Sequence, residues 1–176
     1  PYLSIINPAV FVPPWWLETL MACFERNKNK NPGLVSCSIE NEDEYLWSDV
    51  FGIDSLLRIE NSAMPLVERF GDNTPREVKT QGSRMHLVLL KKEVYKKVRF
   101  DLKFKTMLVQ DIDLCMQIRN LGYSCYWTPY ITATAGSNDI RCGSEKDIES
   151  DRQLLLEKWK GSELLTPSNV FYRGVI

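Results

Sequence analysis

The sharpest feature of the sequence is the stretch Gln110-Asp111-Ile112-Asp113-Leu114-Cys115-Met116-Gln117-Ile118-Arg119-Asn120-Leu121-Gly122-Tyr123. Its apolar residues recur at the spacing of a helix, and a glycine such as Gly122 commonly ends one. Asp111 and Asp113 stand at the expected start of this helix. Acidic residues in a first turn cap free N–H groups and suit the helix dipole. A carboxylate held at a cleft can instead act as a general base, so both roles are open at this point.

The flanking sequence alternates between strand-like and helix-like segments. We expect strands over residues 3–6, 34–39 and 84–90, and two strand-like pieces, 123–127 and 130–135, broken at Thr128-Pro129. We expect helices from Pro13-Pro14 onward, over 91–98 and over 147–159. Residues 100–107 read as loop, and 40–82 give a poor signal with a clear loop at 71–75. This order predicts one α/β domain over residues 1–160 with a mixed sheet, followed by an irregular tail over 161–176.

Composition narrows the class of protein. The chain has 176 residues, 44% of them hydrophobic and 26% charged, which suits a globular domain. Its net charge of −1 gives no global attraction to nucleic acid, so no nucleic-acid partner is expected. No apolar run approaches the roughly 20 residues of a membrane-spanning helix.

Cysteine and histidine usage argues against disulfides and zinc. The five cysteines form no CxxC pair, and an odd number favours a reducing compartment, so we expect a cytoplasmic protein. His86 is the only histidine, which leaves a zinc site short of ligands. Its apolar neighbours indicate a partly buried strand residue rather than a catalytic one.

The stretch 110–123 resembles the motif of the family 2 glycosyltransferases, Glu-Asp-x-Asp-Leu-Cys-x-Arg-x-Arg-x-x-Gly-Tyr. Further similarities run in family order from Leu3 to about Trp159. They are Asn7-Pro8 followed by Trp16-Leu17, the strand and basic turn from Gly82 to Lys92, Phe100-Asp101, and Pro129 with the apolar run after it.

The resemblance implies a partial GT-A fold, which is Rossmann-like with a mixed sheet and flanking helices. It implies a nucleotide-diphosphate-sugar donor, a glycan acceptor and an inverting transfer in which Asp111 is the base. Asp113 would support the helix start or the acceptor. The other expected site residues are Gln110, Arg119 and Trp47 on the acceptor side, and Asn7, Ala9, Lys91 and Lys92 on the donor or diphosphate side.

Three departures from the family pattern bear on the chemistry. Ala9 stands where the family has a metal-binding aspartate, Thr134 stands at or near a usual histidine, and Gln110 replaces the glutamate of the motif. The family's Mg²⁺ or Mn²⁺ is therefore doubtful here, because an alanine side chain cannot ligate a hard cation. The chain is then a metal-independent enzyme, a module that binds without catalysis, or one in which position 9 has drifted or been engineered.

Two further features have both functional and ordinary readings. The stretch from Lys91 to Lys105 carries a net charge of +5, which suits a diphosphate, anionic lipid headgroups or an acidic polysaccharide, or is simply a solvated face. Peripheral membrane contact on the cytoplasmic face follows from the lipid reading. Trp47 is the best candidate for stacking on a sugar, although tryptophans at helical spacing are more often core residues.

The family's nucleotide-binding strands normally precede the position of Ala9. We therefore expect this chain to be the acceptor-side part of a longer protein, and we expect its sheet edge to pair with the missing half or with a second copy of itself. The competing hypotheses are a non-catalytic carbohydrate- or protein-binding module with the same fold, and an unrelated α/β domain whose acidic pair is only a helix cap.

Overall fold

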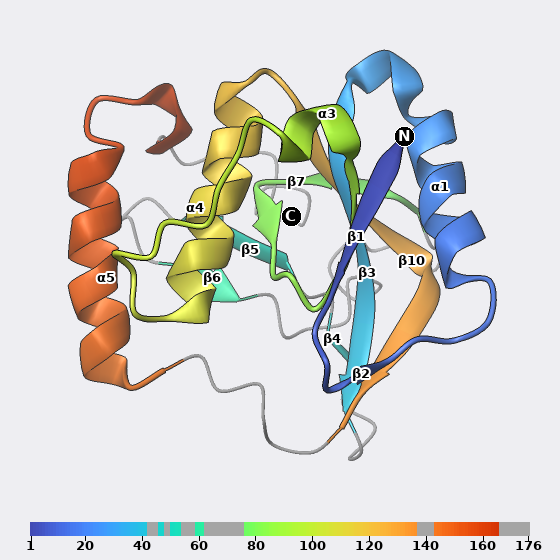
Figure 1. The fold of residues 1–176 in the computed structure, drawn as a ribbon, viewed down its shortest axis with the longest axis horizontal. Helices are drawn as coiled ribbons and strands as arrows, with labels where there is room; N and C mark the ends of the chain where they lie inside the picture. The colour runs from blue at the N-terminus through green and yellow to red at the C-terminus, as the bar shows by residue number, and fades with distance from the viewer. Residues whose placement is uncertain (42–45, 48–49, 54–58, 62–75, 137–142, 166–176) are drawn as a thin grey trace, which may run out of the picture.

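A computed structural model describes residues 1–41, 46–47, 50–53, 59–61, 76–136 and 143–165 (Figure 1). In chain order the elements are β1 (Tyr2–Ile6), β2 (Val10–Phe11), α1 (Trp16–Arg26), η1 (Lys28–Lys30), β3 (Pro32–Asn41), β4 (Leu46–Trp47), β5 (Val50–Ile53), β6 (Ile59–Asn61), β7 (Val78–Thr80), β8 (Gly82–Ser83), β9 (Leu87–Lys91), α3 (Lys92–Tyr95), α4 (Met107–Asn120), β10 (Ser124–Ala135), α5 (Glu145–Lys158) and η2 (Glu163–Leu165).

The main sheet is mixed, as the sequence predicts. Within the described residues it has seven strands in the order β1-β9-β3-β10-β2, with β4 beside β3 and β7 beside β10. β3 and β10 are parallel, and β9 lies antiparallel to both β1 and β3. The strands β1, β3 and β10 therefore all run in one direction. A second sheet of three short strands has the order β6-β5-β8.

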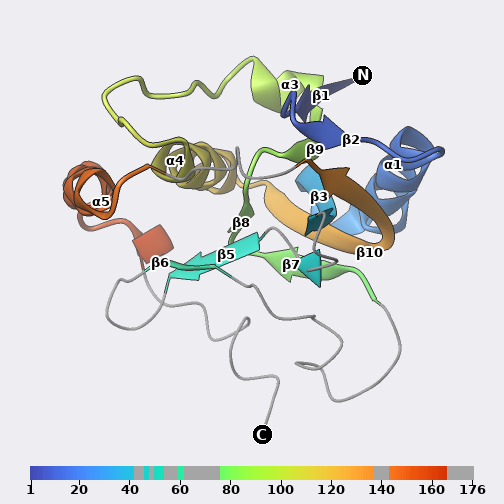
Figure 2. The ribbon, with the colours of Figure 1, turned by 90° about the horizontal axis from the view of Figure 1, so that it is seen from below.

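Helices cover both faces of the main sheet. Figures 1 and 2 show α1 on one face, and α4 with α5 on the other. Side chains along β9 alternate between the two cores, because successive residues of a strand point to opposite faces. Val88 and Leu90 belong to the core under α4 and α5, whereas Leu87 and Leu89 belong to the core under α1. Burial on both faces explains the nearly continuous apolar sequence of this strand.

Helix α4 begins earlier than its sequence suggests. The N–H and hydroxyl groups of Thr106, the residue before the helix, both donate to Asp151 Oδ2 of α5, at 2.7 and 2.9 Å. Because α4 begins at Met107, its first turn contains no acidic residue. The first-turn cap, one of the two roles left open for Asp111 and Asp113, is excluded, because a carboxylate 45 residues away in sequence binds the helix start instead.

A buried carboxylate also binds the end of α5 to α4. Asp113 is 0% exposed, and its Oδ1 accepts a hydrogen bond from Trp159 Nε1 at 2.8 Å. Its Oδ2 accepts from Lys158 Nζ at 2.9 Å and from Gln117 Nε2 at 2.7 Å. A buried charge is tolerated when it is paired and fully hydrogen-bonded. We call these contacts of Asp113 with Lys158 and Trp159 the α4–α5 clip.

The expected break at Thr128-Pro129 is an irregularity within one strand, not a gap between two. β10 runs unbroken past the proline, and its register against β3 shifts between Thr128 and Thr132. Proline lacks the N–H that a regular ladder needs, so a bulge accommodates it.

The segment with the poorest sequence signal contains the short strands β4 to β6, which were not predicted, and the expected loop at 71–75 lies outside the described residues. Strands of two to four residues carry too little periodicity for prediction. In the expected tail, Leu164 and Leu165 pack against the core under α4 and α5.

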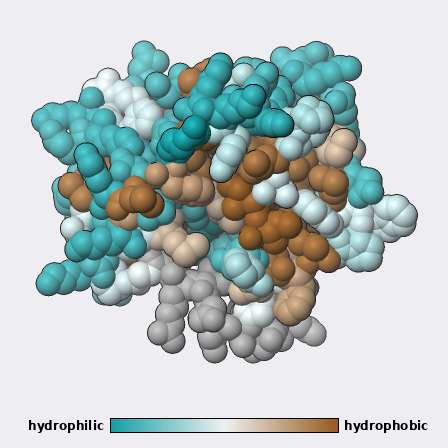
Figure 3. Space-filling model, viewed as in Figure 1, coloured by the Kyte–Doolittle hydropathy of each residue, from teal (hydrophilic) through white to brown (hydrophobic). Residues whose placement is uncertain are grey.

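Strand β1 forms one edge of the main sheet, since β9 is its one partner among the described strands. Figure 3 shows apolar surface gathered over this part of the sheet, and Ile6 is 38% exposed. The strand contains no charged residue or proline, the devices that usually protect an edge. None of the described helices has the length and apolar character needed to cross a membrane.

The α4–α5 clip predicts a stability effect of the substitution Trp159→Phe. This change keeps an aromatic ring but removes the indole N–H, so one oxygen of a fully buried carboxylate loses its donor. We expect the free energy of unfolding to fall by about 1–3 kcal/mol, measured by urea denaturation followed by circular dichroism.

Trp15→Phe is the matched control, because Trp15 is 74% exposed and donates no side-chain hydrogen bond to the described residues. Its free energy of unfolding should stay within about 0.5 kcal/mol of the wild type. Unchanged stability of Trp159→Phe would contradict the clip.

The contact of Lys158 with Asp101 predicts a pH effect. The Lys158 ammonium at 2.8 Å, and next the N–H of Lys103, hold the pKa of the Asp101 carboxyl below its ordinary value. A lowered folded-state pKa adds stability above the unfolded pKa of about 3.9, and this stability is lost as pH falls through the folded value.

Asp101→Asn should therefore lower the free energy of unfolding at pH 7 by up to about 1 kcal/mol. The difference from the wild type should shrink on acidification below about pH 4. Glu157→Gln serves as the control, because within the described part of the chain this charge forms one ion pair, an exposed contact of 3.9 Å with Lys160. A deficit of Asp101→Asn that persists unchanged in acid would rule out this ion pair as its cause.

Candidate functional site

A cavity of about 300 Å³ lies where the end of β1 meets the N-terminal half of α4. Its polar lining residues are Asn7, Gln110 and Asp111. Asn7 precedes the other two by about a hundred positions in the sequence. The apolar part of the lining consists of Ile5, Ile6, Pro8, Met85, Phe100 and Met107. Sites in α/β folds commonly lie beyond the carboxyl ends of parallel strands, and β1 ends at this cavity.

Asp111 forms the acidic wall of the cavity. The residue is 4% exposed, and its Oδ2 accepts a hydrogen bond from the backbone N–H of Met85 at 3.1 Å. Met85 precedes β9, so the central sheet fixes the orientation of the carboxylate.

Asn7 builds the turn that leads from β1 to β2. Its backbone N–H donates to His86 O at 2.8 Å, its side-chain Oδ1 accepts from Ala9 N at 2.9 Å, and its carbonyl accepts from Val10 N at 2.9 Å. Asparagine is favoured in such turns because its side chain can bind the backbone two residues on. His86 itself is buried in the bend before β9, close to its expected place.

Ala9 and Thr134, the two positions at which the resemblance implies metal ligands, lie near each other. Gly136 N donates to Ala9 O at 2.8 Å. Two residues before Gly136, Thr134 pairs with Phe11, which is two residues after Ala9. Ala9 contributes a methyl group where a carboxylate is expected, and Asn7 Oδ1 is already accepting from Ala9 N. Among the described residues, no three His, Cys, Asp or Glu side chains are grouped so as to hold a metal ion. The methyl group of Ala9 cannot supply an oxygen ligand of the kind that Mg²⁺ or Mn²⁺ prefers.

Gln110 combines a structural contact with its place in the cavity. Its Nε2 donates to the carbonyl of Phe104 at 2.8 Å, which fastens the preceding loop to α4. A glutamate at this position could accept but not donate, so the glutamine matches the contact that is present.

Asp113 faces away from the cavity. Residues two apart on a helix do not share a face, and Asp113 points to α5, where it forms the α4–α5 clip. Asp113 therefore binds the end of α5, which differs from the expected support of the helix start. The acceptor-binding role has no support from these contacts.

Arg119, Lys91 and Lys92 are not brought to this cavity. Arg119 lies eight residues beyond Asp111, roughly 12 Å along the helix, and it lines a different cavity. Lys91 pairs with Tyr2 at the opposite end of β1, with its Nζ 5.6 Å from the ring centroid of Tyr123. Lys92 is next to it and exposed.

Trp47 lies in β4, paired with Ile39, and its side chain is outside the described residues. The sequence also missed three residues of the cavity, Met85, Phe100 and Met107. Met85 acts through its backbone N–H, which leaves no signal in residue type. Phe100 belongs to the Phe100-Asp101 pair that resembles the family. Its position in the sequence gave no sign that it would line a cavity together with residues of β1.

Comparison with known proteins gives no family assignment. No protein-family model matches the chain, and no curated protein matches it. The geometry of the cavity, together with the sequence resemblance, is therefore the basis for assigning a function.

Proposed function

We propose that this chain is the acceptor-side part of an inverting glycosyltransferase in which Asp111 is the general base. The observation that supports this proposal best is the position of Asp111, a carboxylate on the wall of a cavity where β1 ends. The cavity brings together several of the segments that carry the family resemblance, among them Asn7-Pro8, Phe100 and Gln110-Asp111. A carboxylate that served only as a helix cap would lie in a first turn, and Asp111 does not.

The proposed reaction moves one proton and one glycosyl group. An acceptor hydroxyl donates its proton to an Asp111 oxygen while the hydroxyl oxygen forms a bond to the anomeric carbon of the donor sugar. The bond from that carbon to the nucleoside diphosphate breaks on the opposite side, and the diphosphate leaves with the electron pair. In-line displacement inverts the configuration. Met85 N–H keeps the carboxylate oriented toward the cavity throughout.

The lining of the cavity favours a reaction that relies on this chain's own side chains. Ala9, next to the cavity, offers no oxygen ligand, and Asn7 Oδ1 already accepts a hydrogen bond from Ala9 N, so the proposed reaction has no step through a metal. The negative charge of the leaving group then requires basic groups or backbone N–H donors, and these come from the donor-binding part of the enzyme in this proposal.

We further propose that the donor-binding part pairs with the open edge of β1. The edge is apolar, uncharged and without a strand partner among the described residues, which is the usual character of a pairing site. Such a partner would bring a nucleotide-sugar donor to the end of β1, beside the cavity. A cytoplasmic location suits both the nucleotide-sugar donor and the four described cysteines, Cys23, Cys37, Cys115 and Cys125, which form no disulfide with one another.

One observation favours a second candidate, a carbohydrate-binding module without catalysis. Ala9 and Thr134 lie together and offer a methyl group and a hydroxyl where the resemblance implies metal ligands. A cavity with one carboxylate and two amide side chains can still bind sugar hydroxyls. Release of nucleoside diphosphate that depends on an acceptor would exclude this candidate.

Asp111→Asn distinguishes the two functions. The amide keeps the shape of the side chain but cannot take the proton, so we expect transfer to fall by about 10²–10⁴-fold. The measurement is release of nucleoside diphosphate from a panel of UDP-, GDP- and dTDP-sugars with glycan acceptors, using the natural polypeptide that carries this chain.

Glu157→Gln, on the exposed face of α5, is the matched loss of one negative charge and should leave the rate unchanged. Thermal unfolding of both variants shows whether the fold is intact. A folded Asp111→Asn variant with full activity would refute the assignment of the base.

A further inference from the structure

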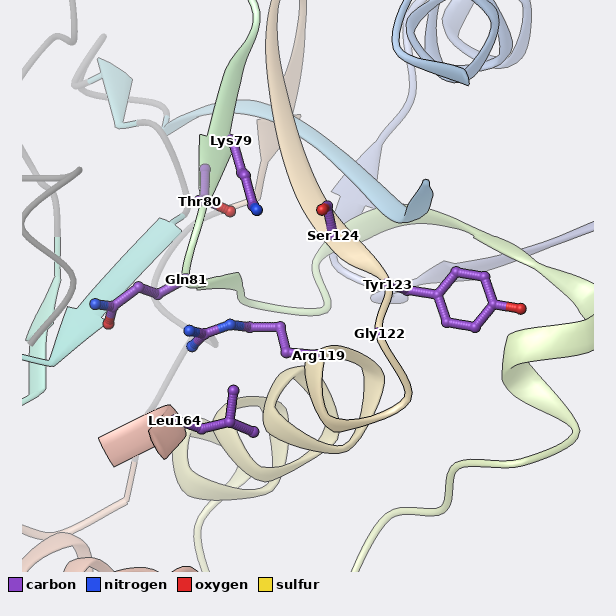
Figure 4. Close-up of a pocket in the computed structure, with 8 residues that line it drawn as sticks. All are labelled: Lys79, Thr80, Gln81, Arg119, Gly122, Tyr123, Ser124 and Leu164. Atoms are coloured by element: carbon purple, nitrogen blue, oxygen red, sulfur yellow. The ribbon is translucent and has the colours of Figure 1, made fainter. Parts of the chain in front are cut away.

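A second cavity, of about 360 Å³, lies at the opposite end of α4 from Asp111 (Figure 4). It is bounded by β7, the start of β10, the last turn of α4 and η2. Its cationic residues are Lys79 and Arg119, and its aliphatic hydroxyl groups belong to Thr80 and Ser124. Leu164 adds apolar surface. Figure 4 shows Lys79, Ser124 and Arg119 facing the space between these elements, while the ring of Tyr123 points away.

The cavity holds two cations that no acid neutralises within the described part of the chain. Lys79 and Arg119 come from different elements, β7 and α4, and neither forms an ion pair with a described carboxylate. Positive groups on separate walls of one cavity repel each other, and an anion between them would relieve that repulsion. Solvent screening is weaker in a recess than on an open surface.

Two hydroxyl groups add hydrogen-bonding capacity. Thr80 is 4% exposed, and its buried Oγ1 has no hydrogen-bond partner among the described atoms. Ser124 is 6% exposed and stands on β10 next to Cys125, the register partner of Thr80. Buried polar atoms in folded proteins nearly always have a partner, so the unsatisfied Thr80 hydroxyl leaves hydrogen-bonding capacity unused beside this cavity.

The end of α4 does not oppose an anion strongly. The last carbonyl groups of a helix carry partial negative charge, but here they accept hydrogen bonds. Gly122 N donates to Arg119 O at 2.9 Å, Tyr123 N donates to Ile118 O at 3.3 Å, and Asn31 Nδ2 donates to Gly122 O at 2.9 Å.

We propose that this cavity binds the phosphate group of a small phosphorylated molecule. A carboxylate has two oxygens and is satisfied by one guanidinium fork, whereas a tetrahedral phosphate offers oxygens in several directions. The arrangement of one guanidinium, one ammonium and two hydroxyls on three elements suits the phosphate. Leu164 and Gly122 would border its organic part. This site is separate from the Asp111 cavity and does not depend on the function proposed for it.

The test is a titration of the isotope-labelled full chain with inorganic pyrophosphate, followed by amide chemical shifts. Shifts should concentrate at residues 79–81, 119 and 122–124. Lys79→Gln and Arg119→Gln should each weaken binding by about tenfold, the loss of one charge-assisted hydrogen bond. Lys160→Gln removes an exposed charge elsewhere and should change the affinity less than twofold.

Thr80→Val separates binding from stability. Replacing an unsatisfied buried hydroxyl with a methyl group should preserve or raise the melting temperature, yet weaken pyrophosphate binding by about threefold. Equal weakening by Lys160→Gln, shifts centred on Asn7 and Asp111, or malonate binding as tightly as pyrophosphate would each overturn the proposal. Lys79 is exposed, so its variant remains informative even if Arg119→Gln fails to fold.

Discussion

The parallel pairing of β3 with β10 is the constraint on which the rest of the described structure depends. Parallel neighbours cannot be joined by a tight turn, so the chain between them must return across the sheet. On this return it adds β9 beside β3 and lays α4 over one face. With α1 on the other face, the central strands are buried on both sides. The place of α4, and with it the place of Asp111, follows from this crossover.

Sequence reasoning identified the elements whose own residues determine them. Helix α4 has a clear apolar spacing and ends before Gly122, whose φ of 81° suits glycine. The mixed sheet and the flanking helices were also predicted. The start of α4 was not, because Asp151 of a distant helix sets it. The bulge in β10 was read as a break, since proline signals an interruption without telling whether the strand continues.

The candidate site was predicted only in part, because it too depends on contacts between segments that are distant in sequence. Asp111, Gln110 and Asn7 do meet at one cavity, whereas Arg119, Lys91 and Lys92 do not. A linear motif gives spacing along a helix but not which turn meets which strand. Asp111 and Asp113 illustrate this, because these two aspartates of one motif point to opposite sides of α4. One carboxylate faces a cavity and the other binds a neighbouring helix.

The α4–α5 clip has an evolutionary consequence. Its buried carboxylate is tolerated only while its donors are present, so positions 113, 158 and 159 are not independent under selection. A lineage that loses Trp159 gains by also replacing Asp113 with a residue that needs no donor. These positions should therefore change together among relatives of this chain. Asp111 has no share in the clip, so its retention or loss in a lineage would report on chemistry and not on helix packing.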